Sequence, residues 1–298
     1  MRPRDTIDLL LLAALWGGSF LFMRMAVHDF GPLALIELRT GIAALFLLPP
    51  LVWGGGLRQF TTNAGPIMLV GVINSALPFT LFAYAMLSIT AGMGSILNAA
   101  SPLFGALIGY FWLRYRLSVG QVIGLVIGFM GVALLMWDKT GLHGSDAALA
   151  LPAAVLGTIS YGLAANYATH RLSGIDTFAV AAGSQTGAAL SVLPFAVWFW
   201  PAHAPAPSAW LAVIALGVLC TGVGYILYFR LLANVGATRA IAVTFLIPVF
   251  GMLFGVSILA ETVTAGMLAG CVVIFVGTAL ATGLLVVAPM QIKPHDSV

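Results

Sequence analysis

The residues of this sequence that could do chemistry lie inside strongly apolar segments. Near the middle of the apolar run 91–111 stand Asn98, Ser101 and Pro102. An unpartnered amide or hydroxyl is costly in hydrocarbon, and a proline leaves the carbonyl four residues earlier, here that of Asn98, without its helical partner. We therefore expect Asn98 and Ser101 to line a polar cavity. A hydrogen bond from Asn98 to a neighbouring helix is the alternative.

The segment 238–259 carries a comparable group at an offset of 146 residues. Pro248 takes the position of Pro102, and Thr244 takes that of Asn98. We expect Thr244 to line the same cavity and the two prolines to act as hinges or kinks. The glycines that follow each proline have a simpler explanation, because small residues four apart let helices pack closely.

A second group of candidates follows helical spacing. Thr221, Tyr225 and Tyr228 fall at i, i+4 and i+7, on one face of a helix. The positions 146 residues earlier hold a hydroxyl and two aromatic side chains, Ser75, Phe79 and Phe82. Such stripes would build a cavity with aromatic walls, although the phenylalanines could equally pack between helices.

Weaker candidates come from a third pair of segments. Ser19 with its neighbour Phe20 resembles Ser160 with Tyr161, at an offset of 141 residues. We add Ser19 and Tyr161 to the substrate-binding candidates. Further polar side chains inside apolar runs that could line the cavity are Asn74, Asn166 and Gln185.

The composition indicates which kind of protein must position these side chains. Of 298 residues, 61% are hydrophobic and 7% are charged, against about 25% charged in an ordinary soluble domain. No soluble core could bury so much apolar surface. Long runs without charge predict membrane helices rather than the short alternating strands of an outer-membrane barrel. The expected class is an all-α integral membrane protein.

Ten apolar stretches are long enough to cross the hydrocarbon layer, which takes about 20 residues. They are 7–27, 32–53, 64–87, 90–112, 118–137, 147–168, 177–200, 208–229, 238–259 and 264–287. The first continues past the length of a signal-peptide core, so we expect it to be retained as a span.

Basic residues predict the orientation of these spans. With a cytoplasmic N-terminus, the inner ends and loops hold Arg2, Arg4, Arg58, Arg114, Arg116, Arg171, Arg230, Arg239 and Lys293. The outer side then holds Lys139, Arg24 and Arg39. Because basic residues accumulate on the cytoplasmic side, we expect both termini to be cytoplasmic.

An internal repeat is the most informative pattern. The segments 101–134 and 247–280 align without a gap, and proline and glycine recur at the same places in both. Five spans per copy is an odd number, so the second copy must be inverted. Arg114 and Arg116 correspond to uncharged Ala260 and Thr262, as the positive-inside rule requires of inverted halves. The predicted repeats are 1–140 and 141–298, which together form one transmembrane domain.

These segments resemble a known family. The stretch "LNAASPLFGALIGYFWLRYRLSVGQVIGLVIGFMGVAL", with "ALWGGSF", "ELRTGIAALFLLP" and "ISYGLAANYATHRL", is similar to EamA-type carriers of the drug/metabolite transporter superfamily. The resemblance implies a ten-helix fold that exports small metabolites. The aromatic middle spans look most like the YddG group of amino-acid exporters. The family often has an acid after spans 4 and 9; this chain keeps Glu261 but has Tyr115 in the first copy.

The charged residues bear on what could drive transport. Glu37 is the carboxylate that lies inside a predicted span, in the outer half with Arg24 and Arg39. We expect a structural ion pair there, and we predict no proton relay because no acid lies near the midplane. The favoured function is therefore a rocking carrier for a neutral or zwitterionic solute, driven by the gradient of the solute itself. The resemblance to the YddG group implies that this solute is an aromatic amino acid.

Several other functions remain to be weighed. A membrane-embedded enzyme is disfavoured because acids and histidines are scattered singly, without a Mg²⁺ or nucleophile arrangement. No cofactor or metal is expected. A channel or facilitator, and an exporter of cationic drugs or polyamines, remain alternatives. The expected partners are a small-molecule substrate and membrane lipid, with no nucleic acid, for a monomer in the bacterial inner membrane.

Overall fold

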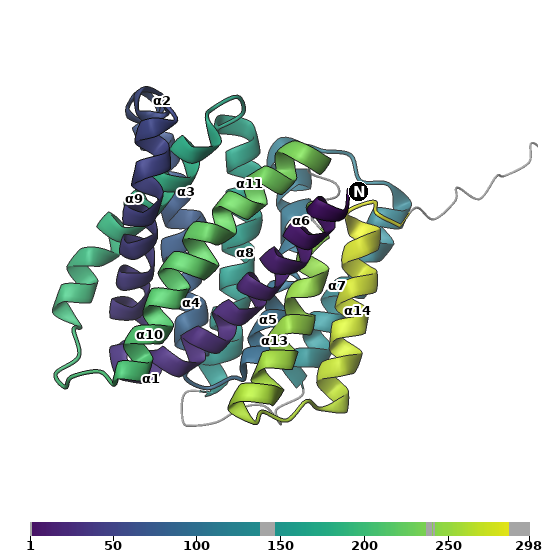
Figure 1. Cartoon of the computed structure of the whole chain (residues 1–298). Helices are drawn as coiled ribbons and strands as arrows, with labels where there is room; N and C mark the ends of the chain where they lie inside the picture. Colours follow the sequence, from purple (N-terminus) through teal and green to yellow (C-terminus); the bar gives the residue numbers. More distant parts are fainter. Residues whose placement is uncertain (1, 138–146, 237–239, 241, 286–298) are drawn as a thin grey trace, which may run out of the picture.

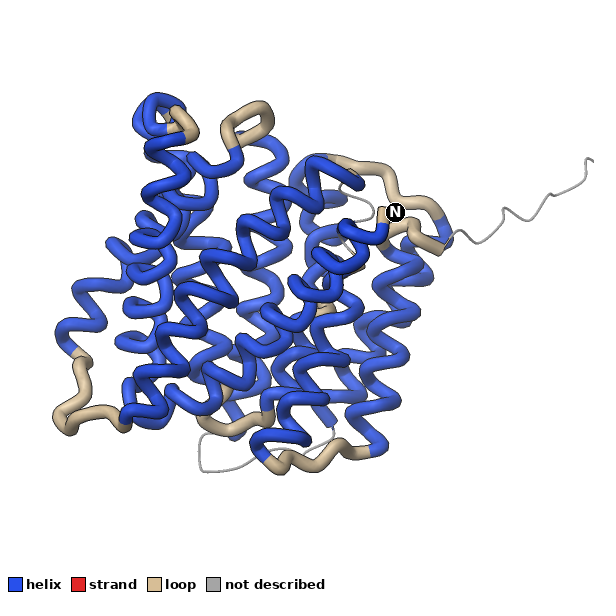
Figure 2. The backbone as a smooth tube through the Cα atoms, in the orientation of Figure 1, coloured by secondary structure: helices blue, strands red, loops and turns tan. Residues whose placement is uncertain are grey.

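The computed structural model describes residues 2–137, 147–236, 240 and 242–285. Within these ranges every element is helical (Figure 2). Lys139, Arg239 and Lys293 lie outside the described residues, as do parts of the predicted spans 238–259 and 264–287.

The helices follow one another with short connections (Figure 1). Up to residue 137 they are α1 (Pro3–Trp53), α2 (Leu57–Thr62), α3 (Ala64–Gly71), η1 (Val72–Ala76), α4 (Leu77–Ala85), α5 (Ala91–Asn98), α6 (Ser101–Leu113) and α7 (Val119–Trp137). After residue 146 they are α8 (Ala147–Arg171), α9 (Thr177–Trp198), α10 (Pro207–Ala215), η3 (Leu216–Val223), α11 (Gly224–Val235), α13 (Val243–Leu259) and α14 (Ala265–Ala281).

Helix α1 consists of two helical segments that meet at a kink at Gly31. The φ of 70° and ψ of 164° at Gly31 are not helical, and a glycine adopts positive φ without a Cβ clash. Pro32 follows and has no N–H to donate to the preceding turn. The break falls between the predicted spans 7–27 and 32–53.

The helices have the lengths and surfaces of membrane segments. Seven of the described helical stretches have at least 18 residues and are apolar enough to cross a membrane, while α13 and α14 are apolar but shorter. Large apolar side chains such as Trp53, Phe111 and Trp137 are exposed on the outside. Exposure of many large apolar side chains is unfavourable in water and favourable in lipid.

Helices α7 and α14 lie side by side in Figure 1. Gly124 of α7 lies against Ala281, and Gly131 lies against Ile274. The contacts therefore advance along one helix while they retreat along the other, so the two helices are antiparallel. Glycines at the contact let the backbones approach closely, as in small-xxx-small helix pairs.

Two unusual backbone features recur at the 146-residue offset. Arg114 and Ala260 end α6 and α13 in the left-handed region, with φ of 56° and 53°. That conformation costs a residue with a Cβ about 1–2 kcal/mol, so it is rarely adopted without a local reason. The π-helical turns η1 and η3 also overlap at this offset.

Candidate functional site

A cavity of about 340 Å³ lies between the helices. Its wall comes from α1, η1, α4, α5, α6, α8, η3, α11 and α13, so both halves of the chain contribute. Sites for small molecules usually measure about 300–1,000 Å³ and combine apolar walls with a few polar groups. The size and the mixed lining suit a small solute.

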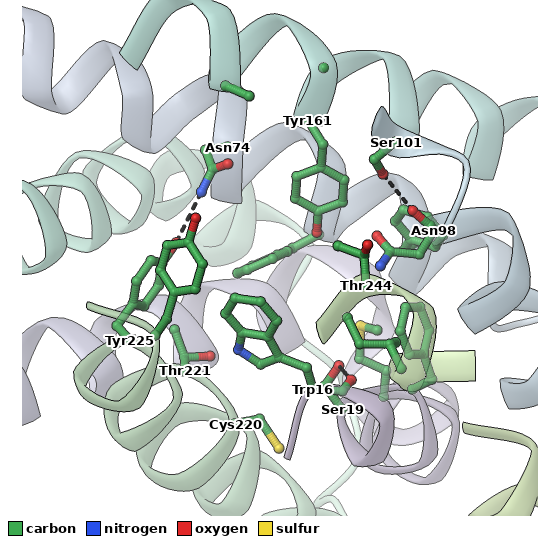
Figure 3. A pocket seen from close by; sticks show the side chains of 18 of the residues that line it. Trp16, Ser19, Asn74, Asn98, Ser101, Tyr161, Cys220, Thr221, Tyr225 and Thr244 are labelled. Carbon is green, nitrogen blue, oxygen red and sulfur yellow. Dashed lines mark hydrogen bonds between the residues drawn. The ribbon is translucent and has the colours of Figure 1, made fainter. Parts of the chain in front are cut away.

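Most of the side chains proposed to contact a substrate lie in this wall. They are Ser19, Phe79, Phe82, Asn98, Ser101, Tyr161, Thr221, Tyr225, Tyr228 and Thr244. Figure 3 shows the labelled members of this group together with Trp16, Asn74 and Cys220. Whether they bind a solute stays a prediction; the structure brings them to one place.

Ser75 does not lie in the wall, which corrects its grouping with Phe79 and Phe82. It is fully buried, and its hydroxyl accepts a hydrogen bond from Gln185 Nε2 at 2.9 Å. Ser75 belongs to the π-helical turn η1, whereas Thr221, its counterpart in the π-helical turn η3, lies in the wall. From this stripe of the first half, Phe79 and Phe82 line the cavity.

The break before Pro102 shapes one side of the cavity. Helix α5 ends at Asn98, and α6 begins at Ser101. Ser101 Oγ donates a hydrogen bond to the carbonyl of Asn98 at 2.6 Å (Figure 3), so the carbonyl that Pro102 leaves free is satisfied locally. Among the described residues, none hydrogen-bonds the side-chain amide of Asn98, which lies in the cavity wall.

Pro248 has a different local geometry. Helix α13 continues through it from Val243 to Leu259, and Pro248 is buried outside the cavity wall. Pro102, in contrast, lies in the wall at the start of α6. The two prolines therefore do not shape their helices equally, and their role as hinges stays a prediction.

Aromatic rings form much of the remaining wall. Tyr161 stacks on Phe82 with 6.1 Å between ring centroids and meets Phe79 edge-on at 6.4 Å. Trp16 packs against Tyr228 at 5.3 Å. These rings pack on one another and line the cavity at once, so the two interpretations of the phenylalanines are compatible.

Hydrogen bonds hold the π-helical turns beside this wall. Asn74 Nδ2 of η1 donates to the Tyr225 hydroxyl at 2.9 Å (Figure 3). Thr221 of η3 donates to the carbonyl of Leu216, five residues earlier, at 2.8 Å. A π-turn, which is defined by backbone N–H to C=O bonds between residues five apart, is rare and frequently found at functional sites.

Comparison with known proteins now identifies the family. A model of the EamA-like transporter family matches residues 7–137 and, separately, residues 148–283. The chain belongs to this family. This EamA-like protein is a multi-pass membrane transporter, in keeping with its apolar helices.

Relatives of this EamA-like transporter match over most of their length. The uncharacterized transporter YoaV of Bacillus subtilis (strain 168) is 26% identical over 282 residues, which cover 93% of this chain and 96% of that protein. The probable amino-acid metabolite efflux pump of Escherichia coli (strain K12) is 24% identical over 296 residues, covering 93% and 94%. A crystal structure at 22% identity has a TM-score of 0.67 and covers 95% of this chain and 98% of that chain, which shows a common fold.

Sequence reasoning missed part of the wall of this EamA-like transporter. Trp16, Met23, Arg39 and Cys220 lie in it. Trp16, Ser19 and Met23 are spaced at i, i+3 and i+7, so the helical period could have found two of them. For Arg39 the sequence favoured an ion pair with Glu37 and not a place in the cavity wall.

The predicted ion pair of Glu37 with Arg24 or Arg39 is wrong. Residues two apart on a helix do not face each other, and Arg39 Nε donates to Thr221 Oγ1 at 3.0 Å instead. Arg24 donates to the carbonyl of Met86. Within the described part of the chain, Glu37 Oε2 is buried without a hydrogen-bond partner.

Two of the other polar candidates, Asn166 and Gln185, take structural roles in this EamA-like transporter. Asn166 Nδ2 donates to the carbonyls of Gly105 and Gly162, at 2.8 and 2.9 Å, and so joins α6 to α8 where their glycines meet. The side-chain amide of Gln185 donates its hydrogen bond to Ser75 Oγ. Asn74 lies in the cavity wall.

Proposed function

We propose that this chain is a secondary transporter that exports small neutral or zwitterionic metabolites, with aromatic amino acids as the expected solutes. The observation that carries the proposal is the cavity, which has aromatic walls and a few hydroxyl and amide groups. Aromatic rings provide a large apolar contact for a ring-bearing side chain. The polar groups of Asn98, Ser101 and Thr221 can hydrogen-bond the amino-acid backbone.

The comparisons support the same solute class. One relative is named as an amino-acid metabolite efflux pump, and it aligns over 93% of this chain. The aromatic character of the wall agrees with the resemblance to the YddG group of amino-acid exporters.

We propose an architecture of ten spans in two inverted repeats, 1–140 and 141–298, with both termini cytoplasmic. Support comes from the antiparallel packing of α7 and α14, which correspond at the 146-residue offset. The left-handed caps at Arg114 and Ala260 and the two matches of one family model point the same way. Carriers built in this manner bind solute between the repeats and rock around it.

The transporter is proposed to work as a monomer in the bacterial inner membrane and to let the solute gradient drive flux. The test uses purified full-length protein in proteoliposomes with a panel of amino acids and one polyamine, with and without an imposed pH gradient. Amino-acid uptake that does not need the pH gradient is expected. Uptake of the polyamine alone would support the cationic alternative, and a strict need for the pH gradient would overturn gradient-driven flux.

The same vesicles separate a carrier from a channel. Solute on the far side should accelerate uptake by a carrier, because the loaded carrier returns in exchange. A channel has no such cycle, so the absence of trans-stimulation would overturn alternating access.

Two variants test the assignment of the cavity as the transport site. Asn98→Ala and Tyr225→Ala should abolish transport while the protein still inserts and purifies as wild type does. Asn63→Ala and Tyr110→Ala are matched controls, because these residues lie outside the cavity wall. Unchanged flux in both cavity variants would remove the assignment.

A further inference from the structure

Arg39 places a cationic group in the wall of the cavity. Of the described side chains that line it, Arg39 is the one with a formal charge. Only 4% of Arg39 is exposed. An ionised side chain inside a membrane protein is expensive and usually marks the path of a substrate or ion.

The described protein groups that contact this guanidinium are neutral. Nε donates to Thr221 Oγ1 at 3.0 Å, and Nη1 lies 3.5 Å from Met23 Sδ. The guanidinium carbon lies 3.6 Å from the centroid of the Phe79 ring, which is a cation–π arrangement. In the part of the chain that the structure describes, the salt bridge found joins Arg230 to Asp8 and leaves Arg39 without a carboxylate.

These contacts fix the guanidinium and leave donors for another group. A guanidinium has five N–H donors, and Nη2 has no hydrogen bond to the described residues, whereas Nε and Nη1 each make one. The end formed by Nη1 and Nη2 therefore keeps N–H groups for two oxygens. A planar fork of this kind matches a carboxylate, which accepts two parallel hydrogen bonds.

Burial of a cation without an opposite charge costs free energy, because the low-dielectric interior solvates the charge less well than water does. The ring of Phe79 and the hydroxyl of Thr221 offset part of this cost. An anionic group that enters the cavity would offset the rest. A cationic solute would meet a like charge at short range and be disfavoured.

We propose that Arg39 binds the carboxylate of the transported solute. The solute class is then amino acids and related carboxylic acids, as opposed to amides, amines and polyamines. This inference rests on the proposed function in one respect, namely that the cavity is the transport site. Phe79 and Thr221 hold the guanidinium in place for this contact.

Binding to purified full-length protein tests the inference separately from transport. The probes are L-phenylalanine and L-leucine, the amide of each, phenethylamine and 3-phenylpropionate, and the readout is the rise in unfolding temperature with ligand concentration. The amino acids should stabilise the protein, whereas their amides and phenethylamine should not. Stabilisation by 3-phenylpropionate would show that the carboxylate suffices without the amine.

Substitution assigns the effect to Arg39. Arg39→Met should weaken apparent affinity for the amino acids about 10- to 100-fold, as expected for loss of hydrogen bonds between charged groups. Arg58→Met is the matched control, because Arg58 is exposed outside the cavity, and it should bind as wild type does. If Arg39→Met does not fold, Arg39→Lys keeps the charge but not the fork, and its affinity should be intermediate.

The outcomes separate the two proposals. Equal binding of an amino acid and its amide by the wild type, no binding of any carboxylate probe, or wild-type affinity in a folded Arg39 variant would each overturn the carboxylate site. Binding that depends on Arg39, with no flux of any probe into proteoliposomes, would uphold the site and overturn the transport function.

Discussion

Glu261 accepts a hydrogen bond from the backbone N–H of Ala91, with 2.9 Å between Oε1 and N. Oε2 of the same carboxylate accepts from the N–H of Gly92 at 3.3 Å. Ala91 begins α5, so the charge lies at the positive end of the helix dipole. The loop after α13 is thereby attached to the helix that carries Asn98.

Removal of this carboxylate should destabilise the protein. Glu261→Ala leaves the first N–H groups of α5 without that acceptor, and we expect a loss of about 1–2 kcal/mol in unfolding free energy. Glu261→Gln keeps an acceptor oxygen without the charge and should lose less. Thermal unfolding of the purified variants in detergent measures both. A Gln variant as unstable as the Ala variant would contradict the role of the acceptor.

The two prolines should differ in their effect on transport. Pro102→Ala restores an N–H that can bond the carbonyl of Asn98, so α5 and α6 can join and move the amide out of the cavity wall. Pro248 lies in a helix that is already continuous, so Pro248→Ala does not join two separate helices. We expect flux to fall strongly in the first variant and little in the second, measured in proteoliposomes at equal protein content. An equal fall in both would contradict this difference.

The contact between α7 and α14 should not tolerate a methyl group at Gly277. A Cβ there would meet the backbone of Gly128, and overpacking of a close contact costs about 1–3 kcal/mol. Gly277→Ala should therefore lower the unfolding temperature. Gly65→Ala is the matched control, because no atom lies within 4 Å of its Cβ position. A similar unfolding temperature for both variants would show that the helices adjust without cost.

Asp8 and Arg230 form a two-pronged ion pair between α1 and α11. Arg230 Nε donates to Oδ2 at 2.7 Å, and Nη2 donates to Oδ1. The Asp8 side chain is 6% exposed, so Arg230→Met leaves a buried carboxylate without a partner and should destabilise more than Asp8→Asn. A double-mutant cycle on unfolding should show coupling of about 0.5–3 kcal/mol. Additive effects would mean that the pair contributes nothing.

Much of the fold and of the cavity could be predicted because the relevant signals are local. Apolar runs of membrane length mark the helices. Side-chain direction in a helix follows a 3.6-residue period, so Thr221, Tyr225 and Tyr228 were predicted to share a face. The structure places all three in one wall. Ser75, the counterpart of Thr221, is instead buried and bonded to Gln185 of α9, a contact between distant segments that the helical period cannot predict.

Contacts between distant segments could not be predicted in this way. Glu37 and Arg39 are close in the chain and opposite in charge, which favoured an ion pair. Arg39 instead bonds Thr221, 182 residues away. The choice depends on which helix packs beside α1 and on the direction in which the guanidinium leaves its own helix. No local period or charge count contains that information.

The sequence by itself determined that the chain spans a membrane with helices, that prolines and glycines recur at an offset of 146 residues, and which helix faces carry polar and aromatic groups. Hydropathy and helical period depend on residues that are close in the chain, so they can be read from the sequence without a structure. Only the tertiary structure decided that these faces enclose one cavity, that Ser101 satisfies the carbonyl of Asn98, and that Arg39 lies in the wall without a counter-charge from the described residues. Those facts depend on how helices pack across the whole chain.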